Sequence, residues 1–300
     1  MTTGFRGIYP ILYAFFDAAD RLDRAAMRHQ VEACVRGGAH GIAVLGLATE
    51  VGKLSLAERR QLLDWAAEDI AGRVPLAVTV AEPSVGAQVD FVRAAQAAGA
   101  GWVILQPPPA RGLPEIEYVR FFGAVADRVE LPVAIQNAPE YIGVGLSPDG
   151  IATLRRNHAN FRLLKGEASA LGIRQVIAAT EGQLTVFNGR GGLELTDILR
   201  AGGAGLIPAP ECFDLQVRIY EAMRAGDEAT ADALYGEILP LVTFLMQSIE
   251  SFLCYGKRLL ARRLGLGPVH SRAPALQPSE FGLACLERHA ARLGPLLADG

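Results

Sequence analysis

Short apolar runs alternate with amphipathic helical segments along the first three quarters of the chain. The runs that predict β-strands cover 7–13, 41–45, 75–80, 101–105, 132–136, 161–165, 184–187 and 205–207. A stretch with helical spacing follows each run, as after the expected caps Asp23 and Ser55, the latter with Glu58 at the capping-box position. The runs are apolar throughout, which is typical of parallel strands buried on both faces. Eight strand–helix alternations therefore predict an α/β fold, a (β/α)8 TIM barrel.

The pattern changes near residue 227, beyond which only helices are predicted. These helices cover 227–245, 247–264 and 279–293. We expect two parts, a barrel over 1–226 and a C-terminal helical extension over 227–300 with a structural or oligomeric role. A doubly wound sheet is the competing fold, but no G-x-G-x-x-G follows the first run and no P-loop is present.

Composition narrows the function classes. The chain has 300 residues, 50% of them hydrophobic, and a net charge of −3, which indicates no nucleic-acid partner. Neither a signal pattern nor an apolar run of membrane length is present, so we expect a cytoplasmic protein without a membrane partner. Four widely spaced cysteines are expected to be reduced, and five histidines lack metal-ligand spacing, so neither metal nor cofactor is expected.

The candidate chemistry centres on one lysine. Barrel enzymes carry their sites at the C-terminal ends of the strands, and of the three lysines only Lys165 ends a predicted strand. Alternation along that strand places Lys165 and Glu167 on one face. Burying a lysine as a cation is costly, which favours the free amine that Schiff-base chemistry requires. The alternative is a lysine that reaches solvent at a strand end, with Glu167 paired to an arginine of the next helix.

Five motifs in order resemble one known family. They are Gly46–Glu50 (GLATE), Leu54–Arg59 (LSLAER), Asn137–Pro139, Leu164-Lys165 ahead of an acidic residue, and Asn188-Gly189. Together they resemble the dihydrodipicolinate synthase / N-acetylneuraminate lyase superfamily over essentially the whole chain. The resemblance implies that Lys165 forms the Schiff base and that residues 47–49 hold the carboxylate of a 2-oxo acid. The residues expected to bind substrate are Ala48, Thr49, Asn137, Gly189 and Ile207.

Departures from the family pattern narrow the reaction. Leu47 and Ala48 stand where the synthase and lyase branches carry hydroxyl residues, Gln136 replaces the proton-relay tyrosine, and Pro107–Pro109 replaces the loop tyrosine. These changes argue against dihydrodipicolinate synthesis, because an amide does not titrate. A branch resembling L-2-keto-3-deoxyarabonate dehydratase shares the Gln-x-Ala-Pro segment that begins at Gln136 and the Lys-x-Glu segment that begins at Lys165.

The expected function is therefore that of a dehydratase acting on a 2-keto-3-deoxy sugar acid, a small-molecule 2-oxo acid. Lys165 would form the imine, Glu167 would be the general base, and Gln136 would orient the hydroxyl or water. Two alternatives stay open: a class I aldolase that releases pyruvate and an aldehyde, and a barrel that binds keto acids without catalysis. The resemblance also implies a homotetramer built as a dimer of dimers, or a homodimer. Glu50 is expected to be structural, and the role of Glu82 is left open.

Overall fold

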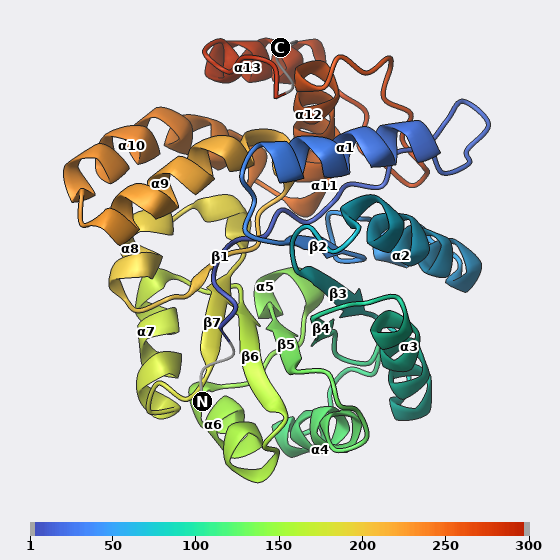
Figure 1. The fold of residues 1–300 in the computed structure, drawn as a ribbon, viewed down its shortest axis with the longest axis vertical. Helices are drawn as coiled ribbons and strands as arrows, with labels where there is room; N and C mark the ends of the chain where they lie inside the picture. The colour runs from blue at the N-terminus through green and yellow to red at the C-terminus, as the bar shows by residue number, and fades with distance from the viewer. Residues whose placement is uncertain (1–3, 297–300) are drawn as a thin grey trace.

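Eight parallel strands form the centre of the molecule, and helices surround them (Figure 1). The computed structural model describes residues 4–296. The strand order is β1-β8-β7-β6-β5-β4-β3-β2. The strands are β1 (Gly7–Ile8), β2 (Ile42–Val44), β3 (Leu76–Val80), β4 (Trp102–Leu105), β5 (Val133–Asn137), β6 (Phe161–Gly166), β7 (Thr185–Asn188) and β8 (Gly205–Leu206).

The first and second strands close the barrel through the segment that follows β1. Ile11 forms a parallel bridge with Ala43, the N–H of Ala43 donates to the carbonyl of Pro10, and the N–H of Leu12 donates to the carbonyl of Ala43, both at 2.9 Å. The predicted first strand, 7–13, is thus much longer than the ladder strand that forms. Pro10 has no N–H to continue the ladder. The predicted barrel fold is confirmed, with structural relatives described below.

Helices surround the barrel, and the first two of them begin at their predicted caps. They are α1 (Arg24–Arg36), α2 (Leu56–Ile70), α3 (Val85–Ala97), α4 (Glu115–Ala126), α5 (Pro139–Ile142), α6 (Pro148–Asn157), α7 (Ala170–Ala179), α8 (Leu195–Arg200) and α9 (Phe213–Ala225). Short 3-10 turns form η1 (Val51–Lys53), η2 (Arg190–Gly192) and η3 (Pro210–Cys212). The Asp23 side chain accepts from two backbone N–H groups of α1, and Ser55 with Glu58 forms the predicted capping box of α2. The short helix α5 was not predicted.

Three aromatic rings fill the barrel interior. Trp102 stacks on Phe187 with ring centroids 5.4 Å apart, and Tyr9 meets both rings edge-on, at 5.8 and 5.2 Å. All three side chains are buried. Since close-packed rings leave no channel along the axis, the barrel has a solid core, as is usual for this architecture.

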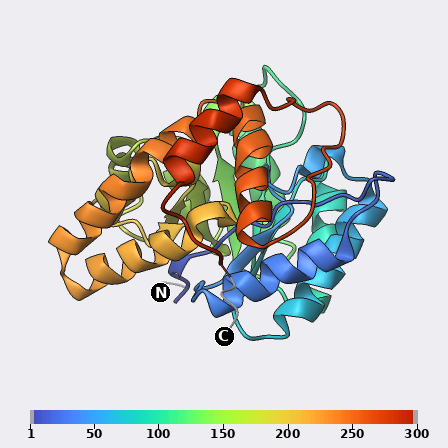
Figure 2. The same cartoon turned by 90° about the horizontal axis from the view of Figure 1, so that it is seen from above.

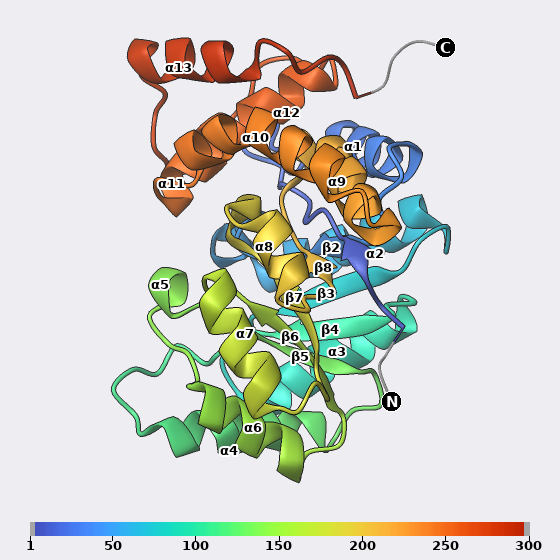
Figure 3. The same cartoon turned by 90° about the vertical axis from the view of Figure 1, so that its left-hand side faces the viewer.

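The C-terminal helices gather beyond α1 and α9 on one side of the barrel (Figure 3). They are α10 (Glu228–Leu245), α11 (Ile249–Ser251), the π-helical turn η4 (Phe252–Gly256), α12 (Lys257–Arg263) and α13 (Glu280–Ala290). Figure 2 shows α13 next to α12, where Arg262 and Glu287 form an ion pair at 2.5 Å. The single helix predicted over 247–264 is confirmed: α11, η4 and α12 run without a gap from Ile249 to Arg263, with a π turn inside the helix. The division of the chain near residue 227 stays a prediction.

Between residues 4 and 296 no single helix is long and apolar enough to cross a membrane. Two consecutive helices, Glu228–Leu245 and Ile249–Arg263, reach the length and apolar composition of a membrane span only when they are counted together. The chain bends by 109° between them.

Candidate active site

Lys165 ends β6 with its side chain buried inside the barrel mouth. Its register partners are Gln136 on β5 and Phe187 on β7. Only 4% of the residue is exposed, and it lines a small cavity at the C-terminal ends of the strands. A lysine that reaches bulk solvent, the alternative interpretation of the sequence, is excluded by this burial.

Glu167 lies against Lys165, as alternation along the strand predicts. The Lys165 Nζ is 3.0 Å from the Glu167 Oε1, and the Gln136 Nε2 donates to the same oxygen at 2.5 Å. Glu167 is 5% exposed, so it is not a surface carboxylate paired with an arginine of the next helix. The structure therefore brings Lys165 and Gln136 into contact with Glu167 and supplies a carboxylate beside the amine.

The cavity beside Lys165 is small and mostly apolar. Its volume is about 30 Å³, and a water molecule needs roughly 10–15 Å³ on this measure. Three of the residues expected to bind substrate line it, namely Ala48, Gly189 and Ile207. The N–H groups of Leu47 and Ala48 donate to no acceptor within the described part of the chain, so they are available to a ligand.

Thr49 and Asn137, also expected to bind substrate, do not line this cavity. The Thr49 hydroxyl donates to the Leu12 carbonyl at 2.6 Å and accepts from the Leu45 N–H at 3.0 Å. The Asn137 amide is bonded at both ends to the backbone of Leu146, at 2.6 and 3.0 Å. Both side chains thus hold loops that shape the site.

Several lining residues were missed by sequence reasoning. Met246, Ile249 and Phe252 come from the C-terminal helices and cover the cavity, although that segment was expected to be structural or oligomeric. Arg190, after β7, also lines it; its Nε is buried without a hydrogen-bond partner in the described chain, and its φ is +52°. A positive φ at a non-glycine residue often marks a functional site, but it can be seen only in the folded backbone and not in the sequence.

The other two lysines share one carboxylate. Glu50 forms one ion pair with Lys53, at 2.6 Å, and a second with Lys257, which is only 2% exposed. Burial lowers the pKa of Lys257, against the opposing attraction of Glu50. The expectation that Glu50 is structural agrees with these contacts. Glu82, whose role was open, accepts from Arg59 at 2.7 Å.

A buried tyrosine–carboxylate pair joins the ends of β1 and β8. The Tyr13 hydroxyl donates to the Glu211 Oε2 at 3.0 Å, and the Tyr13 ring packs against Phe252. Burial raises the pKa of Glu211 to about 7. Glu211 was not singled out from the sequence, because it follows the last strand in a Pro-Glu-Cys turn with no recognisable motif.

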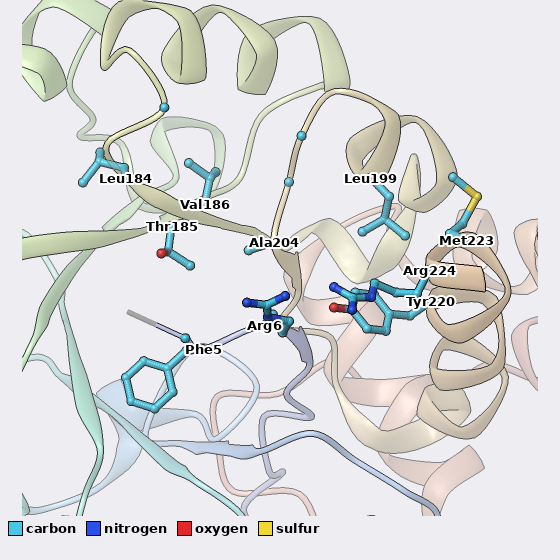
Figure 4. A pocket seen from close by; sticks show the side chains of 14 residues that line it. Phe5, Arg6, Leu184, Thr185, Val186, Leu199, Ala204, Tyr220, Met223 and Arg224 are labelled. Atoms are coloured by element: carbon cyan, nitrogen blue, oxygen red, sulfur yellow. The ribbon is translucent and has the colours of Figure 1, made fainter. Parts of the chain in front are cut away.

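Other cavities lie away from Lys165. One of about 370 Å³ opens where β7 and β8 begin, and the Arg6, Tyr220 and Arg224 side chains gather at its edge (Figure 4). None of the predicted site residues lines it. Among residues 4–296 no group of three or more His, Cys, Asp or Glu side chains is arranged to hold a metal ion. The four cysteines are free and buried, as expected.

Comparison with known proteins identifies the family. The model of the dihydrodipicolinate synthetase family matches residues 4–286. A 4-hydroxy-tetrahydrodipicolinate synthase of Methanoculleus marisnigri is 31% identical over 248 residues, which cover 79% of this chain and 83% of that protein. The probable 2-dehydro-3-deoxy-D-pentonate aldolase YjhH of Escherichia coli is 30% identical over 242 residues, covering 79% and 80%.

Solved structures agree. YagE of Escherichia coli, described as a prophage protein of the dihydrodipicolinic acid synthase family in complex with pyruvate, superimposes with a TM-score of 0.87 at 26% identity, covering 97% of this chain and 99% of that one. A dihydrodipicolinate synthase from Rhodopseudomonas palustris gives a TM-score of 0.90 at 22% identity, covering 98% and 99%. The chain belongs to the dihydrodipicolinate synthetase family and is an enzyme of the lyase class.

Proposed function

We propose that this lyase forms a Schiff base through Lys165 and dehydrates a 2-keto-3-deoxy sugar acid. The observation that carries the proposal is the contact of one carboxylate oxygen, the Glu167 Oε1, with both the Lys165 Nζ at 3.0 Å and the Gln136 Nε2 at 2.5 Å. Once Lys165 has formed the imine, the proton transfers at the substrate need a base beside it, and Glu167 is placed to be that base.

The first half of the reaction activates the substrate. The free Lys165 amine adds to the C2 carbonyl, and the resulting C2 hydroxyl leaves as water with a proton taken from solvent, which gives an iminium. The iminium withdraws electrons from C3, and Glu167 removes a C3 proton to give an enamine. The free N–H groups of Leu47 and Ala48 bind the substrate carboxylate, in place of the hydroxyl side chains that this chain lacks there.

The second half eliminates water. The enamine electrons expel the C4 hydroxyl, which leaves as water with the proton that Glu167 returns. Hydrolysis of the remaining imine releases a dehydrated 2-oxo acid and restores the Lys165 amine. Gln136 and Thr49 do not supply protons here: the first is an amide, and the second is bonded to backbone on both sides.

Arg190 suits the hydroxylated end of such a substrate. Arg190 is among the residues that line the cavity, and its guanidinium forms an ion pair with Glu194 at 3.1 Å. The cavity of about 30 Å³ is too small for a sugar acid, so we expect Met246, Ile249 or Phe252 to shift when substrate binds.

An aldolase that cleaves C3–C4 is the second candidate. It is favoured by the names of two relatives, YjhH and the putative 2-dehydro-3-deoxy-D-gluconate aldolase YagE, which is 27% identical over 242 residues. It would use the same imine, but Glu167 would take the proton of the C4 hydroxyl.

One experiment separates these functions. The protein is incubated with pyruvate or with each member of a panel of 2-keto-3-deoxy acids, reduced with borohydride and analysed by mass spectrometry, and products are assayed in parallel. An adduct at Lys165 and a dehydrated 2-oxo acid support the dehydratase; pyruvate, detected with lactate dehydrogenase, supports the aldolase. Absence of any adduct would leave only a keto-acid-binding barrel.

The assembly is also part of the proposal. We infer a homotetramer built as a dimer of dimers, or a homodimer, from membership of the family. One solved structure of the same fold is described as a monomeric dihydrodipicolinate synthase variant, so a monomer is the alternative to be tested. Sedimentation or light scattering of the purified chain distinguishes dimer, tetramer and monomer.

A further inference from the structure

A second glutamine extends the contacts of Glu167 away from the cavity. Gln106 follows β4, and its Nε2 donates to the Gln136 Oε1 at 2.8 Å. The Gln136 Nε2 then donates to the Glu167 Oε1. The chain of contacts crosses three neighbouring strands, β4, β5 and β6 (Figure 1).

The direction of these hydrogen bonds is fixed by their end point. An ionised carboxylate only accepts hydrogen bonds, whereas each glutamine amide has an accepting oxygen and a donating nitrogen. If the Gln136 amide were turned over, its oxygen would face the Glu167 carboxylate, and its NH₂ group would face the NH₂ group of Gln106. In the orientation that Glu167 selects, the Gln136 oxygen accepts from the Gln106 Nε2, so Gln106 adds a second hydrogen bond that stabilises this orientation.

The backbone of Gln106 is held firmly. Its N–H donates to the Val80 carbonyl, and its carbonyl accepts from the buried Gln88 Nε2, both at 2.9 Å. The same Gln88 nitrogen donates to the Glu82 carbonyl at 3.0 Å, which ties the end of β3 to the end of β4. Gln106 does not line the cavity beside Lys165, so its route to the reacting atoms runs through Gln136.

We propose that Gln106 is a positioning residue: it holds the Gln136 amide with its N–H toward Glu167 and so aims the base at the substrate. This inference rests on the proposed function, because it concerns the step in which Glu167 moves a proton. Gln106 takes no part in imine formation, since the carbonyl carbon is attacked by Lys165.

The test is a double-mutant cycle on Gln106→Met, Gln136→Met and the double variant, since coupled residues give non-additive losses. We expect Gln106→Met to lower kcat about tenfold with KM unchanged, in line with the loss of one hydrogen bond. The double variant should be no slower than Gln136→Met alone, because Gln106 has nothing left to orient. All three should form the borohydride adduct with pyruvate as the wild type does.

Two outcomes overturn the inference: an unchanged kcat for Gln106→Met, or losses that multiply in the double variant. Gln96→Met is the matched control, since Gln96 is an exposed glutamine whose amide contacts Glu130. If Gln106→Met does not fold, Gln106→Asn takes its place in the cycle, because it keeps the amide but is one methylene too short to reach Gln136. A wild-type protein without an adduct would refute the proposed function and this inference together, whereas an adduct with multiplicative losses would refute this inference alone.

Discussion

Gly189 and Glu167 approach so closely that a methyl group on the Gly189 Cα would lie 2.7 Å from the Glu167 Cγ. No carbon atoms pack at that distance, so the glycine leaves the room in which the carboxylate meets Lys165. The family motif Asn188-Gly189 therefore has a steric role as well. The Asn188 Nδ2 donates to the carbonyls of Gly166 and Ala168, at 2.8 and 3.0 Å, and fixes the backbone on both sides of Glu167.

Gly189→Ala should displace Glu167 and slow turnover about a hundredfold, as expected for a misplaced catalytic group. The ψ of Gly189 (−122°) lies outside the regions that alanine favours, so we expect some loss of stability as well. Steady-state kinetics with circular dichroism measures both. Gly86→Ala, where a Cβ would meet nothing within 4 Å, is the control. Normal turnover in Gly189→Ala would contradict the steric role.

The two members of the ion pair should fail at different steps. Lys165→Ala should abolish both turnover and the borohydride adduct. Glu167→Gln keeps the shape of the side chain but cannot take a proton, so the adduct should still form while kcat falls about 10²–10⁴-fold. Mass spectrometry and product assays give the two readouts. Full turnover in Lys165→Ala would rule out the Schiff-base scheme.

The raised pKa of Glu211, about 7, predicts a pH-dependent stability. The folded protein binds this proton more tightly than the unfolded chain, whose carboxyl has the ordinary value of 4.5. Its contribution is thus fully present below about pH 4.5 and is lost as the pH rises through 7.

Glu211→Gln removes that titration. Between pH 4 and pH 8 the free energy of unfolding should shift in favour of the variant by on the order of 3 kcal/mol. Urea unfolding of both proteins at several pH values measures the shift, and the exposed Glu237→Gln is the surface control. If the difference in free energy of unfolding between the two proteins does not change with pH, the pKa of Glu211 is not raised by folding and the prediction is wrong.

Glu50 should matter more than either of the lysines that it binds. Glu50→Gln leaves the buried Lys257 without a counter-charge, and breaking such a pair costs about 3–5 kcal/mol. Lys257→Met should cost less, because Glu50 keeps Lys53. The double variant Glu50→Gln/Lys257→Met should recover stability relative to Glu50→Gln alone. Thermal or urea unfolding ranks the three, and a double variant weaker than both singles would contradict this assignment.

The sequence predicted the barrel because the signals for it are local. Apolar runs, the Asp23 cap and the Ser55–Glu58 capping box act over a few residues and survive folding unchanged. The pairing of Lys165 with Glu167 could likewise be predicted, because side chains two positions apart on a strand point to the same face.

What the sequence could not supply was contact over long separations. Thr49 reads as a free hydroxyl, yet it is bonded to Leu12, and the helix over Ile249–Arg263 contains a π turn at Phe252–Gly256 that its helical pattern does not indicate. A Cβ on Gly256 would lie 2.3 Å from the Tyr13 hydroxyl, so this turn is fitted to a residue more than two hundred positions earlier. Such complementarity exists only in the folded chain.

Met246, Ile249 and Phe252 cover the cavity from helices outside the barrel, while the amine and its carboxylate stand on a barrel strand. Substitutions in that cover can therefore reshape the space offered to a substrate tail and leave the bond-making atoms untouched. Substrate specificity can therefore change through the C-terminal helices, which take no part in the proton transfers.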